Sequence, residues 1–410
     1  MKTGWQRKEI REVADVFDGP HATPRTVEAG PIFLGISALQ DGAVNLSETR
    51  HVTEDDFKKW TRRVRPTAGD IVFSYETRLG QAAIIPEGLE CCLGRRMGLV
   101  RFRDGQVIPR FFLYQYLSPQ FRAFLDANTI RGATVDRISI KDFPSFPIDL
   151  PPLPEQQRIL TILDNAFAGL ATAAANAETN LKNARELFDS YLNSIFTSRD
   201  GEWAEKSLRD VSIEFGRGKS KHRPRNDPAL YDGKYPFVQT GDIRNSGGVI
   251  TEYSQTYNEA GLAQSKLWPK GTICITIAAN IAETGILTFD ACFPDSIIGM
   301  VVDPALTNNK FVEYLLRFFK AVLKAQGKGS AQDNINLATF ENRKFPFPPI
   351  KIQDMLAAKL DSVAKEVERL ELLYHAKLKS VSELKQAILQ VAFCGELVSP
   401  PSRAIREAAE

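Results

Sequence analysis

Residues 151–196 read PPLPEQQRILTILDNAFAGLATAAANAETNLKNARELFDSYLNSIF, and this stretch sets the architecture of the chain. After its opening prolines, apolar residues recur at alternating steps of three and four, the heptad pattern of a long helix with one apolar face. The stripe consists of Leu163, Phe167, Leu170, Ala174, Ala177, Leu181, Ala184, Phe188, Tyr191 and Ile195. Because a helix cannot bury such a face alone, the pattern predicts a helical partner.

A matching helix is predicted about 200 residues later, between Ile352 and Phe393. Its stripe is interrupted only by Lys377 and consists of Leu356, Leu360, Val363, Val367, Leu370, Tyr374, Val381, Leu384, Ile388 and Val391. We expect the helices at 151–200 and 348–398 to pair as an antiparallel coiled coil, which gives the chain an internal pseudo-twofold axis.

The register of this pairing is a further expectation. Aligning Leu163 with Leu360 also aligns Leu187 with Leu384, and it places Asn180 in the repeat position of Lys377. A polar residue within an apolar seam specifies register. We therefore expect these two polar side chains to lie near the pseudo-twofold axis and to fix the register.

The sequence before each helix is also repeated. Trp5 followed by IREV matches Trp203 followed by LRDV, and GATVDRIS at 132–139 matches GSAQDNIN at 329–336. Short β-branched or aromatic runs such as Ile71-Val72-Phe73, punctuated by glycine and proline, predict strands.

The expected fold class is therefore α+β. Two strand-rich domains, residues 1–150 and 201–347, are joined by the two long helices, with a short tail at 399–410. Each domain carries a helix near its end. Two similar but non-identical modules of this kind suit a gapped DNA site with two different halves.

Composition narrows the class of protein. Lys and Arg total 52 against 50 Asp and Glu, so any site for a polyanion must be local rather than a property of the whole chain. We find no targeting segment and no apolar stretch approaching about 18 residues, so we expect a soluble, cytoplasmic protein without a membrane. The five cysteines show no metal-ligand spacing and are expected to be free, buried thiols.

One segment of the second domain concentrates positive charge. Between Gly216 and Asn226 it carries Arg217, Lys219, Lys221, His222, Arg223 and Arg225 without an acid. This density suits phosphate, although a solvated basic loop without a ligand is the alternative. Gly218-Lys219-Ser220 resembles the end of a P-loop, but Ile213 stands where the motif requires its first glycine.

Candidate base-reading residues follow the strands. In the first domain they are Tyr75 and Arg78, just beyond an apolar strand, together with Arg95 and Arg96; an arginine fork can reach guanine O6 and N7. The corresponding stretch of the second domain offers Asn280 and Glu283, which suit adenine and cytosine edges.

Motifs of catalysis are missing from the sequence. The four histidines lie in no H-E-x-x-H or H-x-E arrangement, and no G-x-S-x-G elbow or Walker motif is present. We therefore expect no catalytic residue and no metal site on this chain.

The segment PLPEQQRI at 152–159, which opens a long helix after a strand-rich domain, resembles the specificity subunit of type I restriction-modification enzymes. Its second copy, PIKIQD at 349–354, is degenerate but keeps Gln353 where the first has Gln156. Gly132-Ala133 with Ile138, and Gly329-Ser330 with Ile335, are similar to the glycine box that ends recognition domains of that family.

The resemblance implies a non-catalytic adaptor that binds bipartite, gapped double-stranded DNA, one half-site per domain, with the paired helices as spacer. It further implies two methyltransferase subunits that use S-adenosylmethionine (SAM), and ATP-driven restriction subunits, so that no cofactor binds this chain itself. Helix surfaces that await partners are expected to carry apolar patches. A coiled-coil scaffold without DNA affinity and a divergent DNA-modifying enzyme are the alternative hypotheses.

Overall fold

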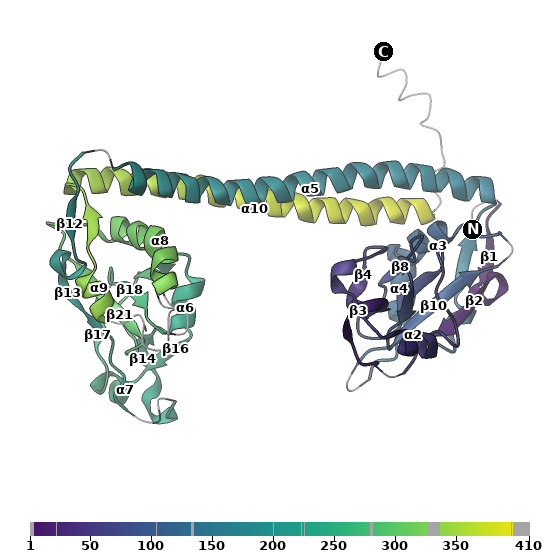
Figure 1. Ribbon diagram of the computed structural model, residues 1–410, viewed down its shortest axis with the longest axis horizontal. Helices are drawn as coiled ribbons and strands as arrows, with labels where there is room; N and C mark the ends of the chain where they lie inside the picture. The colour runs from purple at the N-terminus through teal and green to yellow at the C-terminus, as the bar shows by residue number, and fades with distance from the viewer. Residues whose placement is uncertain are drawn as a thin grey trace, which may run out of the picture. The chain divides into compact units, whose positions relative to one another are not determined.

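The computed structural model describes residues 4–21, 23–103, 105–132, 135–199, 201–222, 224, 226–278, 282–326, 337–394 and 396, with backbone only for 321–326 and 339. The chain divides into two compact units. The first unit is Met1–Glu178 with His375–Glu410, and the second is Thr179–Tyr374. Each contains one strand-rich domain and one end of each long helix, and each is described by itself below (Figure 1).

The first domain is built on a four-stranded antiparallel sheet in the order β2-β10-β7-β8, beside a three-stranded sheet in the order β6-β3-β9. The strands β1 and β11 pair antiparallel next to the start of the long helix. The strands are β1 (Gln6–Glu9), β2 (Ala14–Asp18), β3 (Val27–Leu34), β4 (Leu39–Gln40), β5 (Ala43–Val44), β6 (Arg50–His51), β7 (Ile71–Ser74), β8 (Ala82–Ile84), β9 (Cys91–Leu93), β10 (Met97–Phe102) and β11 (Pro147–Leu150). The helices are α1 (Ile10–Val13), α2 (Glu54–Trp60), α3 (Pro109–Tyr116) and α4 (Pro119–Ala127).

The second domain repeats this plan with a five-stranded sheet, β13-β21-β18-β19-β15, and a four-stranded sheet, β16-β14-β20-β17. The strands β12 and β22 pair as β1 and β11 do. The strands are β12 (Ala204–Lys206), β13 (Ser212–Arg217), β14 (Tyr231–Phe237), β15 (Val249–Ile250), β16 (Gln255–Tyr257), β17 (Leu267–Trp268), β18 (Ile273–Thr276), β19 (Thr284–Leu287), β20 (Ala291–Cys292), β21 (Ile297–Val302) and β22 (Phe345–Phe347). The helices are α6 (Thr240–Asn245), α7 (Glu259–Ala263), α8 (Asn309–Gln326) and α9 (Leu337–Asn342).

The two long helices are α5 (Leu153–Ser198) and α10 (Ile350–Cys394), which pack together (Figure 1). In the first unit the start of α5 shares a core with the end of α10, through Leu163 and Leu389. In the second unit the end of α5 shares a core with the start of α10, through Phe188 and Leu360. The helices therefore run antiparallel within each unit, which confirms the expected α+β fold with paired helices.

The expected seam of α10 holds only in part in its second half, where Val381 and Ile388 are half-buried but Leu384 and Val391 are exposed. Leu163, Leu360 and Val367 are buried and Leu170 is half-buried, but Leu187 is 58% and Leu384 50% exposed. Asn180 and Lys377 are exposed too, so neither lies within an apolar stripe. The physical reason is a step of four after Tyr374, which brings Leu378 and Lys385 onto the packed face beside Val381 and Ile388.

Another expectation fails on α5. An 18-residue window of this helix reaches a mean hydropathy of 1.2, so by length and composition alone α5 could cross a membrane. In the structure 17% of this window is buried, including Leu163, and Asp164 pairs with Arg110 at 3.0 Å.

Candidate nucleic-acid interface

The glutamine of the PLPEQQRI segment fastens α5 to the first domain. The Gln156 side chain is fully buried and its Nε2 donates to the carbonyl oxygens of Gln106 and Pro151, both at 2.9 Å. Its Oε1 accepts the backbone N–H of Ile108, also at 2.9 Å. These bonds tie the beginning of α5 to the loop that precedes α3.

Gln353 does the same for α10 and the second domain. It is 1% exposed, and its Nε2 donates to the carbonyls of Leu306 at 3.0 Å and Pro348 at 2.8 Å. Its Oε1 accepts the hydroxyl of Thr307 at 2.6 Å. The residue that carries the family resemblance is thus a structural clamp, a role that the sequence reasoning missed.

A second pair of contacts repeats beside the clamp. The hydroxyl of Tyr114 donates to Asp164 at 2.8 Å, and that of Tyr314 donates to Asp361 at 2.6 Å. Burial and the adjacent carboxylate raise the pKa of both tyrosines. Each strand-rich domain is therefore fixed on the helices by a buried glutamine and a tyrosine–aspartate hydrogen bond at equivalent positions.

The first domain has a cation-lined cavity of about 480 Å³ where β7 ends. Tyr75, Arg95 and Arg96, expected from the sequence, line it. The residues His21, Arg137 and Lys141, which the sequence reasoning did not single out, line it as well. Arg95, Arg137 and Lys141 are exposed, so their charges are available to a polyanion.

Backbone bonds explain why these distant segments meet. The N–H of Ile138 donates to the carbonyl of Tyr75 at 2.8 Å, and the N–H of Thr77 donates to that of Asp136 at 3.3 Å. Ile138 itself is 3% exposed and packs in the core. The glycine box therefore lies against the loop after β7 and brings Arg137 to the cavity.

Tyr75 contributes to the wall of this cavity, but its hydroxyl already has a hydrogen-bond partner. Its side chain is 7% exposed, and its hydroxyl donates to Asp18 at 2.8 Å. Burial, followed by this hydrogen bond, raises its pKa. Asp18 also pairs with His21 at 2.9 Å, so the carboxylate joins two walls of the site.

The arginines near the cavity differ in their solvent exposure and in their partners. Arg96 forms an ion pair with Glu76, whereas Arg95 is exposed. Arg78 does not line the cavity; its guanidinium donates to the carbonyl of Ser37 at 3.2 Å. Arg95 is the more accessible of the two arginines at this turn.

The basic loop of the second domain is anchored on its own domain. The N–H groups of Lys221 and His222 donate to Gln264 Oε1 at 2.6 and 3.0 Å, and Ser265 Oγ donates to the Lys219 carbonyl at 2.8 Å. The His222 ring lies 2.8 Å from Asp227. The side chains of Arg217, Lys219 and Lys221 are exposed; Arg223 and Arg225 lie outside the described residues.

A smaller cavity of about 240 Å³ adjoins this loop, with neutral polar side chains that include Ser220, Gln239, Gln255 and Ser296. Of the two residues predicted to read bases here, Asn280 lies outside the described residues. Glu283 is 15% exposed at its side chain and pairs with Lys320 at 2.6 Å. Its carboxylate is therefore committed to α8.

Among the residues that the structure describes, no group of three His, Cys, Asp or Glu side chains could hold a metal ion. The cysteines are free, and all but the exposed Cys394 are buried.

A duplicated α+β domain, clamped twice onto a pair of antiparallel helices, defines the class of two-domain target-recognition subunits. The family model for the "Type I restriction modification DNA specificity domain" matches residues 2–180 and again 200–374. The chain therefore belongs to the specificity subunits of type I restriction-modification systems, and its two strand-rich domains are target-recognition domains.

Known members show the same extent and fold. The chain described as the MjaX type I restriction enzyme specificity subunit of Methanocaldococcus jannaschii is 22% identical, over 96% of this chain and 93% of that one. The EcoKI specificity subunit of Escherichia coli K12 is 20% identical, over 88% and 81%. The crystal structure of the HsdS subunit from Thermoanaerobacter tengcongensis superimposes with a TM-score of 0.56 at 18% identity, over 97% and 98%. A chain from a structural study of assembly in a type I system gives 0.74 at 19%, over 96% and 99%.

Proposed function

We propose that this chain binds a bipartite, gapped DNA sequence, with one half-site at each recognition domain, residues 1–150 and 201–347. The observation that carries the proposal is the pair of cavities near equivalent strand ends, one cationic and one neutral. Cations position a domain on phosphates and arginine forks read guanine, whereas amides and hydroxyls pair with other base edges. Two half-sites of different sequence fit this arrangement.

The chain acts in this proposal as a non-catalytic adaptor. Two methyltransferase subunits that use SAM, and ATP-driven restriction subunits, supply the chemistry. Support comes from leucines left exposed on the helices of the second unit, where Leu372 is 67%, Leu187 58% and Leu373 56% exposed. Large apolar side chains left exposed, such as the adjacent Leu372 and Leu373, are available for contact with a partner protein.

Selection of bound DNA tests the proposal. The full chain, or the chain assembled with the methyltransferase subunits, is incubated with duplexes of random sequence, and the retained molecules are sequenced. We expect two short conserved blocks separated by a fixed number of unspecified positions. A single block would contradict the bipartite assignment. No enrichment and no affinity for DNA would favour the scaffold hypothesis, and strand cleavage or methyl transfer by the chain alone would favour the enzyme.

A further inference from the structure

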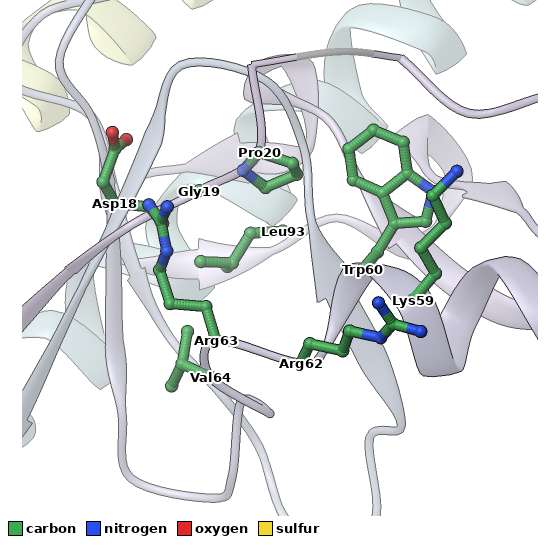
Figure 2. Close-up of a pocket in the computed structure, with 9 residues that line it drawn as sticks. All are labelled: Asp18, Gly19, Pro20, Lys59, Trp60, Arg62, Arg63, Val64 and Leu93. Atoms are coloured by element: carbon green, nitrogen blue, oxygen red, sulfur yellow. The ribbon is translucent and has the colours of Figure 1, made fainter.

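The first domain contains a second cavity, of about 320 Å³, between the turn after β2 and the end of α2 (Figure 2). Its apolar lining comes from Pro20, Trp60, Val64 and Leu93. Exposed Lys59, Arg62 and Arg63 line it as well, and so does Asp18, whose carboxylate is bonded to Tyr75 and His21. An apolar cavity with several cations at its rim suits a planar group that carries negative charge.

Trp60 is held in place by the domain. It ends α2 and packs against the small core cluster of Phe33, Val52, Phe57 and Cys92. The indole Nε1 is covered from solvent and has no hydrogen-bond partner among the described residues. The core thus holds the ring as a rigid aromatic surface at the cavity.

The cations at the rim have few commitments. Lys59 and Arg62 form no ion pair with any residue that the structure describes. Arg63 donates to the backbone carbonyl of Asp18 at 3.3 Å. Asp18 in turn contacts Tyr75 and His21 of the 480 Å³ cavity, so the two cavities share a wall in one domain.

The second domain is built differently at the equivalent place. Gly19 and Gly218 occupy equivalent turns. Each donates its N–H to the carbonyl of the first residue of the neighbouring strand in the sheet, Met97 at 2.8 Å and Ile297 at 2.9 Å. In the second domain this turn is bonded directly to Gln264 and Ser265 just after α7, as described above. In the first domain the corresponding space is the Trp60 cavity.

We propose that the Trp60 cavity binds one nucleotide whose base is unstacked, with the base against the indole ring and the phosphate at Lys59 and Arg62. Aromatic stacking of single bases beside a basic groove is a sequence-tolerant mode of nucleic-acid binding. This inference rests on the proposed function in taking the nucleotide from DNA beside the first half-site. A free mononucleotide has the same chemistry and is tested separately.

The test measures the affinity of the full chain for two DNAs by fluorescence polarisation. One is the intact duplex that carries the selected site; the other has a single unpaired nucleotide beside the first half-site. We expect the second to bind about tenfold more tightly, a gain of the size that one stacked base provides. Trp60→Ala should abolish the gain, Trp60→Phe should keep most of it, and Lys59→Ala should reduce it. Binding of the intact duplex should change little in all three.

Equal loss of the gain in Trp60→Phe and Trp60→Ala, or no loss in Trp60→Ala, would overturn the stacking assignment, provided that thermal melting shows both variants folded. A separate arm titrates dAMP against the quenching of tryptophan fluorescence, with Trp60→Phe as control. Quenching that depends on Trp60, without a gain for the unpaired DNA, would establish the nucleotide chemistry and exclude DNA as its source. Absence of all DNA binding would contradict the proposed function, whereas the dAMP arm would still test the cavity.

Discussion

The two recognition domains share the same arrangement of strands and helices, but they differ in the turns that line their cavities. The turn before β10 carries Arg95 and Arg96, whereas the equivalent turn before β21 carries Asp295 and Ser296. The turn after β2 offers His21, where the second domain has Ser220. At these two turns the first domain therefore carries positive charge, whereas the second carries acidic and neutral side chains.

This difference separates the residues that hold both domains together from the residues that vary between the domains. The glutamine clamps and the tyrosine–aspartate contacts recur at equivalent positions, although Gln156 Oε1 accepts a backbone N–H and Gln353 Oε1 accepts a hydroxyl. They lie at the helices, away from the strand ends. Substitution at the clamps should affect folding in either domain, whereas substitution at the rims should affect DNA binding in one.

The largest expected effect comes from breaking a clamp. Gln156→Ala removes three hydrogen bonds and leaves buried backbone groups without partners, so we expect it to lower the free energy of unfolding by about 4 kcal/mol. Gln353→Ala should do the same in the second unit. Hydrogen exchange followed by mass spectrometry should show increased exchange in the affected unit. Exposed Gln157 provides the matched control, and a Gln156→Ala variant as stable as Gln157→Ala would contradict the clamp.

The next effect concerns one core position at which the domains differ. Gly42 faces Leu113, whereas Gly248 faces Glu313, which is 7% exposed. Burial raises the pKa of Glu313 from 4.5 to about 7, against the lowering influence of Arg317, Lys310 and a hydrogen bond from Thr284. Between these pH values the unfolded chain loses the proton and the folded chain keeps it. Stability should therefore fall as pH rises from about 4.5 to about 7, by about 3 kcal/mol.

Glu313→Leu should remove this pH dependence and stabilise the second unit above pH 7, as measured by urea unfolding at pH 5 and pH 8. Glu313→Gln, which keeps the shape, should remove the pH dependence alone. The reciprocal change, Leu113→Glu, should introduce the same dependence in the first unit. An unchanged pH profile in Glu313→Gln would show that the carboxyl does not titrate as described.

Exchanging a residue between the equivalent turns before β10 and β21 tests whether each domain reads its own half-site. Arg95→Asp gives the first domain the residue that the second carries at 295, and we expect a loss of about 2 kcal/mol in DNA affinity because a cation is replaced by an anion. Selection of random duplexes should show changed preference in one block only. Loss of preference in both blocks would mean that the domains do not read their half-sites independently.

The smallest effect is expected at the basic loop. Lys219→Ala and Lys221→Ala should each weaken binding by about 1 kcal/mol for all sequences and reduce the slope of affinity against salt by about one. The comparison is with Lys58→Ala, an exposed lysine of α2 that lines neither cavity of the first domain. If a variant with both changes keeps the slope of affinity against salt unchanged, this loop does not contact phosphates.

The repeat, the long helices and the strand-rich domains could be predicted because periodicity and proline-rich boundaries are local signals. The contacts between residues far apart in the chain could not be predicted in this way. Arg137 reaches the cavity only through the hydrogen bond of Ile138 to Tyr75, and Trp60 faces Pro20 across about 40 residues of chain. Contacts of this kind depend on how sheets pack, which no pattern in one segment records.

The errors of the sequence analysis have a similar origin. Lys377 fits the heptad on paper, yet Leu378 takes the packed position because the helix adjusts its phase to the partner. The contact of Tyr75 with DNA stays a prediction; the residue lines the cavity, and the bond of its hydroxyl to Asp18 could not be foreseen from the sequence. Gln156 was noted as part of a helix start, and its buried partners became visible only in the fold.

The central claim is that each domain contributes one half of a DNA target. Base-resolution methylation of the genome tests it most directly, in cells that carry this gene with its methyltransferase partner, in cells that lack only this gene, and in cells with Arg95→Asp. The account predicts methylated adenine at one gapped, two-part motif, its loss without the gene, and alteration of one half alone in the variant. Methylation that is unchanged without the gene would contradict the account.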